Sequence, residues 1–99
     1  MSGVGKMHVL VIYDISNDKV RNKISERLKD YGLQRVQYSA FWGQLNMNRR
    51  EELMFRLQKL LSNTMGSIIM IPIGEKERSQ IIKLENLDYE MEEKLEEKS

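Results

Sequence analysis

The chain has 99 residues, of which 40% are hydrophobic and 31% are charged, a composition typical of one globular domain rather than a disordered chain. It contains no cysteine, which excludes a disulfide framework and a thiolate metal site and fits a reducing, cytoplasmic location. No apolar run reaches the roughly 18 residues that cross a bilayer, so we expect no membrane association.

The net charge of +1 conceals two regions of opposite charge. Residues 85–98 hold seven acidic and two basic side chains, a net charge of −5, and the rest of the chain carries +6. A basic body attracts polyanions, although charge alone fits a solvated surface with an acidic solubility tail equally well. Four apolar residues of the tail recur at helical spacing, namely Leu84, Leu87, Met91 and Leu95. The tail is therefore either an amphipathic helix or a disordered run.

The first half of the chain predicts a strand, a helix and a second strand region. Residues 7–15 form a run of apolar residues that suits a strand buried on both faces. Asn17 is a good helix cap, and Gly32 stands where a left-handed residue ends a helix. The apolar face of that helix consists of Val20, Ile24, Leu28 and Tyr31. Residues 33–45 alternate in polarity, which predicts either two short strands with a break near Tyr38–Ser39 or one bent strand.

The second half predicts a helix, a strand and a short final strand. Asn48 and Glu51 form a sequence like a capping box at the start of the helix, and Gly66 is expected to end it. Residues 67–73 form another apolar strand, which should end or lie at a sheet edge near Pro72 because proline has no amide donor. A charged turn over 75–78 precedes the final strand, which is expected over 80–84.

This order predicts an α+β domain of the ferredoxin-like βαββαβ plan, with an antiparallel sheet and an additional C-terminal strand. The domain spans residues 1–84, in which 1–6 are an N-terminal extension, and 85–99 are the acidic tail. The two helices of this plan cover one face of the sheet, yet the first strand is apolar on both faces. We therefore expect a homodimer, in which a second copy covers the bare face and the final strand joins the partner's sheet.

Few residues offer catalytic chemistry. The single histidine, His8, has no metal-ligating neighbour in the sequence and is expected to be structural. No phosphate-binding loop, zinc motif or nucleophile elbow is present. Asp14 ends the first strand, and its carboxylate suits Mg²⁺ or Mn²⁺; the alternative is that it caps its own turn. One carboxylate per chain is too few for a two-metal site, but two copies of Asp14 that meet near the axis of a dimer could hold a metal together.

Basic and aromatic residues are interleaved along the chain. Arginine suits phosphate oxygens and aromatic rings can stack on bases, so the pattern fits nucleic-acid binding. The alternative is a solvated helix face, with Trp42 and Tyr38 in the core. The residues are Lys19, Arg21, Lys23, Arg27, Lys29, Arg35, Arg49 and Arg50, with Tyr13, Phe41 and Trp42 between them.

Several of these residues occur together in one known pattern, which consists of Tyr13-Asp14-Ile15, Arg21-Asn22, Leu28, Gly32 and the block RVQYSAFWG over 35–43. The pattern resembles the small CRISPR-associated adaptation protein family, that of the second Cas protein, over residues 7–84. The resemblance implies a ferredoxin-like homodimer whose last strand crosses to the other subunit. It also implies a metal-dependent endonuclease with Asp14 at the dimer interface as the metal ligand and catalytic residue.

The same resemblance implies a place in spacer acquisition and two hypotheses for it. In the first, the protein cleaves single-stranded RNA or double-stranded DNA with Mg²⁺ or Mn²⁺. The residues that flank the catalytic Asp14 are then Tyr13, Arg21, Arg35 and Phe41, and those that bind the nucleic acid are Lys19, Arg21, Lys23 and Arg35. In the second, the dimer is a non-catalytic DNA-binding scaffold that bridges dimers of the CRISPR integrase subunit.

Overall fold

Four strands form one antiparallel sheet in the part of the chain that the computed structural model describes, residues 6–86. In chain order they are β1 (Met7–Ile15), β2 (Gln34–Gln37), β3 (Ala40–Leu45) and β4 (Gly66–Ile73). They lie side by side in the order β2-β3-β1-β4, so β1 is central and β4 is an edge strand. The predicted α+β class and βαββαβ order are confirmed.

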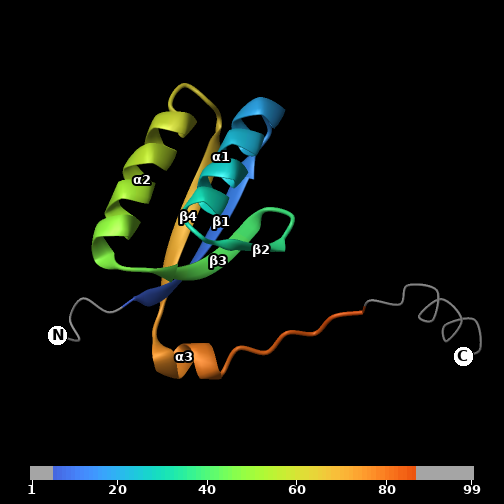
Figure 1. Cartoon of the computed structure of the whole chain (residues 1–99). Coiled ribbons are helices and arrows are strands. Elements are labelled where there is room, and N and C mark those ends of the chain that lie inside the picture. Colours follow the sequence, from blue (N-terminus) through green and yellow to red (C-terminus); the bar gives the residue numbers. More distant parts are fainter. Residues whose placement is uncertain (1–5, 87–99) are drawn as a thin grey trace, which may run out of the picture.

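Two helices, α1 (Asp18–Asp30) and α2 (Met47–Leu61), cover the same face of this sheet (Figure 1). Alternate residues of β1 point toward them and are buried, because successive side chains of a strand face opposite sides. The fully buried side chains are Val9, Val11, Ile24, Leu28, Phe41, Leu53 and Leu57. Each such side chain contributes roughly 1.5–3 kcal/mol through removal from water, so this layer holds the strand ends in place.

The ends of α1 follow the sequence signals. The Asn17 side chain accepts a hydrogen bond from the amide of Val20 at 3.0 Å, which caps the helix as predicted. After the helix, Gly32 has a φ of 84°, a left-handed conformation that glycine adopts without a steric penalty. The chain can therefore turn directly into β2.

The predicted start of α2 is wrong by two residues. Asn46, not Asn48, is the N-cap, and its side chain accepts a hydrogen bond from the amide of Arg49 at 2.8 Å. Asn46 and Asn48 offer the same side-chain chemistry, so the sequence alone could not rank them. The helix also ends at Leu61 rather than near Gly66, because Asn63 takes up the left-handed turn with a φ of 64°.

The strand region over 33–45 breaks at Tyr38–Ser39 into β2 and β3, which was one of the two predicted arrangements. A register shift between Arg35 and Gln37 accompanies the break. The alternative interpretation that placed Tyr38 in the core is wrong, because its side chain is 69% exposed at the turn. Phe41 is fully buried beneath the helices.

The segment after β4 differs from the prediction. Pro72 lies on the edge strand, as expected. The charged stretch that follows is a short helix, α3 (Glu75–Ser79). The predicted strand over 80–84 does not form within this chain, because residues 81–86 run away from the sheet and have no strand neighbour in the described part (Figure 1). The tail over 87–99 lies outside the described residues.

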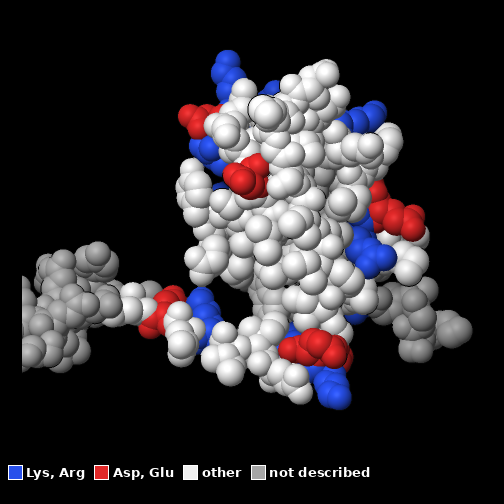
Figure 2. All heavy atoms as spheres, turned by 180° about the vertical axis from the view of Figure 1, so that it is seen from behind, with Lys and Arg blue, Asp and Glu red and all other residues white. Residues whose placement is uncertain are grey.

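The sheet face opposite the helices is uncovered and mostly apolar. Ile12, Ile69 and Ile71 are 39%, 53% and 39% exposed on it, and they are neighbours across β1 and β4. Figure 2, which views the molecule from this side, shows a centre with few charged side chains and lysine and arginine toward the margins. No helix in the described part of the chain is long and apolar enough to cross a bilayer.

Candidate functional site

Asp14 lies at the end of the central strand, on the uncovered face of the sheet. Its neighbours Tyr13 and Ile15 are buried under the helices, so alternation turns the Asp14 side chain to the opposite side, where the residue is exposed. It stands opposite Ser67 of β4 in the strand register. An exposed carboxylate therefore borders the apolar face described above.

Gly66 fixes how closely β4 approaches this strand end. Its φ is 153°, and a Cβ atom placed on it would lie 2.7 Å from the backbone oxygen of Asp14. Any other residue would push the two strands apart at the position of the carboxylate. Gly66 is thus a positioning residue for Asp14.

Tyr13 points to the opposite side, into the layer beneath the helices. The residue is 2% exposed, and its ring stacks on Phe41 with centroids 6.3 Å apart. Its hydroxyl has no hydrogen-bond partner among the described residues. Burial raises the pKa of the Tyr13 phenol above its usual value, and the nearby charge of Arg35 offsets part of the rise.

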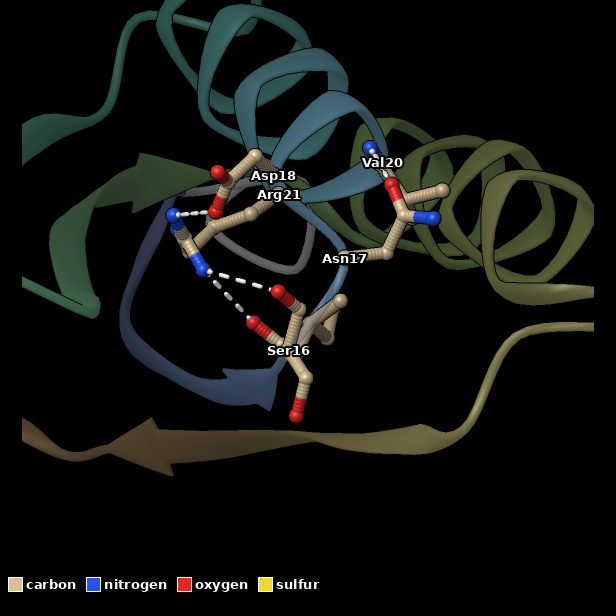
Figure 3. Close-up of polar contacts among 6 residues, drawn as sticks. Ser16, Asn17, Asp18, Val20 and Arg21 are labelled. Atoms are coloured by element: carbon tan, nitrogen blue, oxygen red, sulfur yellow. Dashed lines mark hydrogen bonds and ion pairs between the residues drawn. The ribbon is translucent and has the colours of Figure 1, made fainter.

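Arg21 closes the turn between β1 and α1 (Figure 3). Its guanidinium donates hydrogen bonds to the backbone oxygens of Ile15 at 3.0 Å and Ser16 at 3.4 Å, and it pairs with the Asp18 carboxylate. The hydrogen bond to Asp18 raises the pKa of Arg21 above its usual value. These contacts hold a positive charge immediately beyond the strand end that carries Asp14.

Arg35 is more exposed and covers the outside of the aromatic pair. Its guanidinium carbon lies 4.9 Å from the centroid of Phe41, a cation–π contact, and the group donates to the backbone oxygen of Tyr38. Arginine has five N–H donors, so the remaining donors face solvent. Of the two arginines, Arg35 is better placed to bind an incoming phosphate.

A small cavity of about 40 Å³ joins these side chains, and we call its lining the arginine notch. The lining consists of Tyr13, Arg21, Asn22, Ser25, Arg35 and Tyr38. Tyr38 also lies against Arg21, whose guanidinium carbon is 5.7 Å from its ring centroid. On α1, Lys19 and Lys23 are both exposed and stand four residues apart, on one face of the helix.

The structure therefore divides the residues predicted for the site into two groups. Tyr13, Arg21, Arg35 and Phe41 lie together on the helix side, whereas Asp14 lies on the uncovered face. His8 is tilted against Trp42 with ring centroids 5.3 Å apart, in line with the structural part predicted for it.

The donor chemistry of Asp14 suits a hard divalent cation, because carboxylate oxygens are the ligands that Mg²⁺ and Mn²⁺ prefer. Within residues 6–86, however, no three histidine or acidic side chains gather as a metal-binding group. A metal site built on Asp14 would therefore need ligands from outside these residues, such as a second copy of Asp14.

Sequence reasoning missed Tyr38, Ser25 and Gly66. The possible strand break at Tyr38–Ser39 could have indicated Tyr38, because a residue in a turn is exposed and this turn follows the strand that carries Arg35. Gly66 was read as the end of a helix, and only the strand register reveals its contact with Asp14. For Ser25, on the inner side of α1, the sequence carried no signal.

Comparisons with known proteins agree with this geometry. The family model described as CRISPR associated protein Cas2 matches residues 7–81. A protein of Desulforudis audaxviator named CRISPR-associated endoribonuclease Cas2 is 48% identical over 71 residues, which cover 72% of this chain and 67% of the relative. A Thermoproteus tenax protein named CRISPR-associated endonuclease Cas1/endonuclease Cas2 fusion is 35% identical over 76% of this chain and 28% of the fusion.

The fold comparison gives the same family. The crystal structure of Streptococcus pyogenes Cas2 superposes with a TM-score of 0.69 at 26% identity, covering 80% of this chain and 100% of that one. The resemblance noted in the sequence is confirmed by both kinds of comparison. The chain belongs to the Cas2 family of CRISPR-associated proteins.

Proposed function

We propose that this protein is a metal-dependent endonuclease that hydrolyses phosphodiester bonds in single-stranded RNA or double-stranded DNA during CRISPR spacer acquisition. The observation that carries the proposal is the exposed carboxylate of Asp14 at the edge of an uncovered apolar sheet face. The curated relative described above, named an endoribonuclease, supports RNA as a substrate.

The proposed enzyme is a homodimer formed through the uncovered face. Ile12, Ile69 and Ile71 provide the apolar contact, and burial of such a surface in a second copy removes it from water. Because Asp14 borders the same face, a two-fold axis close to it would bring two carboxylates together. This arrangement supplies the second ligand that one chain lacks.

The chain's own residues would then perform distinct tasks. The two Asp14 carboxylates would hold Mg²⁺ or Mn²⁺, which when bound supplies a Lewis acid and a water of lowered pKa. Arg35 would bind a phosphate oxygen through its free donors, and Arg21 would keep positive charge at the end of β1. Lys19 and Lys23 would attract the nucleic-acid backbone. Tyr13 and Phe41 would support Arg35 from beneath.

Replacing Asp14 with asparagine tests the proposal. Asp14→Asn keeps the size of the side chain and removes its charge, so metal-dependent cleavage of a labelled single-stranded RNA should fall at least about 100-fold, a loss of the order known for essential polar groups. Unfolding and dimerisation should stay unchanged. Asp30→Asn, at the far end of α1, is the matched control and should cleave normally. Full activity of a nuclease-free Asp14→Asn preparation would contradict the scheme.

A second candidate function is the non-catalytic scaffold, favoured by the Cas1/Cas2 fusion among the relatives. In this proposal the dimer joins the CRISPR integrase, Cas1, and its basic residues grip duplex phosphates. Spacer integration by Asp14→Asn would then equal that of the unmodified protein. Arg35→Ala would weaken DNA binding and reduce the log–log salt slope by about 0.9, the effect of one lost phosphate contact. Measuring cleavage and integration on the same variants separates the two functions.

A further inference from the structure

An apolar groove runs along α2 on the side of β4, away from both the arginine notch and the uncovered sheet face. It consists of two hollows of about 560 and 570 Å³. They share Phe55, Gln58 and Leu61, so they form one continuous depression. Nothing in the two functions proposed above uses this groove.

Large apolar side chains remain exposed along the groove. Phe55 is 59% exposed and Met54 is 37% exposed, although both lie on a helix whose other face is buried. Exposed apolar surface of this kind, in a continuous depression, marks a place where another apolar surface binds. Leu57, Leu61 and Ile68 line its deeper part.

The chain itself holds a segment that matches the groove in pattern and length. Leu84, Leu87, Met91 and Leu95 recur at spacings of three, four and four residues, which predicts one apolar stripe on a helix. A helix over 84–95 would be about 18 Å long at 1.5 Å per residue, and the groove follows α2 over a similar span from Arg50 to Ser62.

The charges are complementary as well. Arg50 lies toward the start of the groove and Lys59 toward its end, with Glu51 as the one acidic residue in the lining. Residues 85–98 carry a net charge of −5. Two basic groups flanking apolar side chains are thus complementary in charge to a segment whose apolar stripe is surrounded by acidic residues.

The path of the chain indicates which copy provides the segment. Residues 81–86 lead away from α2 in their own chain (Figure 1). The groove, in contrast, lies beside the free edge of β4, where the final strand of a second copy is expected to add. We propose that residues 84–95 of each subunit bind as an amphipathic helix in the α2–β4 groove of the other subunit. This inference rests on the homodimer of the proposed function.

The absence of cysteine from the sequence makes this proposal directly testable by disulfide cross-linking. Gln58→Cys places a thiol in the groove, and Met91→Cys places one on the tail of a second, size-tagged chain. After the two full-length variants are mixed and oxidised, the mixed disulfide should exceed at least fivefold that of a control pair, Lys29→Cys with Met91→Cys. The control thiol lies exposed on α1, outside the groove.

Two further variants define the outcome. Arg50→Glu combined with Lys59→Glu should reduce the mixed disulfide several-fold, and Asp14→Asn should leave it unchanged. Equal yields for Gln58→Cys and Lys29→Cys would overturn the proposal. So would a disulfide that, in a chain carrying both Gln58→Cys and Met91→Cys, forms only within that one chain. Loss of Cas1 binding on Phe55→Ser, with cross-linking at the control level, would assign the groove to Cas1 instead.

The failure of this inference can be told from that of the proposed function by measuring the mass in solution by sedimentation. A protein that is dimeric and cleaves RNA but gives no groove-specific disulfide retains the proposed function and loses the tail contact. A monomeric protein loses both.

Discussion

Tyr13 and Asp14 are neighbours in sequence and lie on opposite faces of the sheet. Tyr13 joins the arginine notch beneath the helices, and Asp14 borders the uncovered face. A motif that contains both residues therefore serves two different surfaces. Tyr13 packs against Phe41 within the core, beneath Arg35, so in the proposed enzyme it would be a positioning residue, whereas Asp14 would be the metal ligand.

The buried phenol predicts a specific dependence of stability on pH. Burial raises the pKa of Tyr13 in the folded state. The contribution of the protonated phenol to the free energy of unfolding is therefore complete below about pH 10, the ordinary pKa of tyrosine in an unfolded chain. It is lost as pH rises through the folded pKa, since the unfolded state loses its proton first. The free energy of unfolding in urea should fall less steeply above pH 10 for Tyr13→Phe. Parallel curves for the two proteins would contradict this reading.

At the scale of the elements, the strongest local sequence signals were sufficient to predict which helix or strand forms. The apolar run of β1 and the cap at Asn17 predicted a central strand and α1 correctly. The start of α2 was not predicted correctly. Asn46 and Asn48 have the same side-chain chemistry, and only the path of the chain after β3 decides which of them reaches a free amide. The exposure of Tyr38 was not predicted either, since one residue of irregularity between Arg35 and Gln37 changes which side chains share a face.

The corrected cap leads to a prediction for α2. Asn46→Ala removes the acceptor for the amide of Arg49, so the free energy of unfolding should fall by about 1 kcal/mol. Asn48→Ala is the matched control, and its effect should stay within about 0.5 kcal/mol, as is usual for exposed positions. Urea denaturation followed by circular dichroism measures both. A larger loss of unfolding free energy for Asn48→Ala than for Asn46→Ala would instead place the cap at Asn48.

At the scale of the whole molecule, the helices leave one sheet face without cover, and this feature links fold to function. The sequence predicted the bare face, because β1 is apolar on both sides while two helices cover one. It could not place Asp14 beside that face and the arginine notch on the other, since this division depends on how β3 and α1 pack. Asp14 and the arginine notch therefore lie on opposite faces of the sheet and do not share one pocket.

The uncovered face predicts the oligomeric state. Ile69→Lys places a charge in the centre of the apolar contact, where burial without a partner is costly. The variant should sediment as a monomer at micromolar concentration and should lose metal-dependent cleavage, because the two Asp14 side chains would separate. Met47→Lys is the control, since Met47 is 64% exposed at the start of α2, outside this face. A dimeric and active Ile69→Lys variant would rule out pairing through this surface.

The position of Pro72 affects whether copies of this protein can aggregate through the edge of the sheet. β4 is an edge strand, and the unpaired backbone groups of such an edge can pair with strands of other copies and form fibrils. Pro72 brings no amide to that edge, so an incoming chain meets a gap near the end of the strand. The interruption shortens the stretch of β4 that can pair with an added strand, which disfavours fibril growth along this edge.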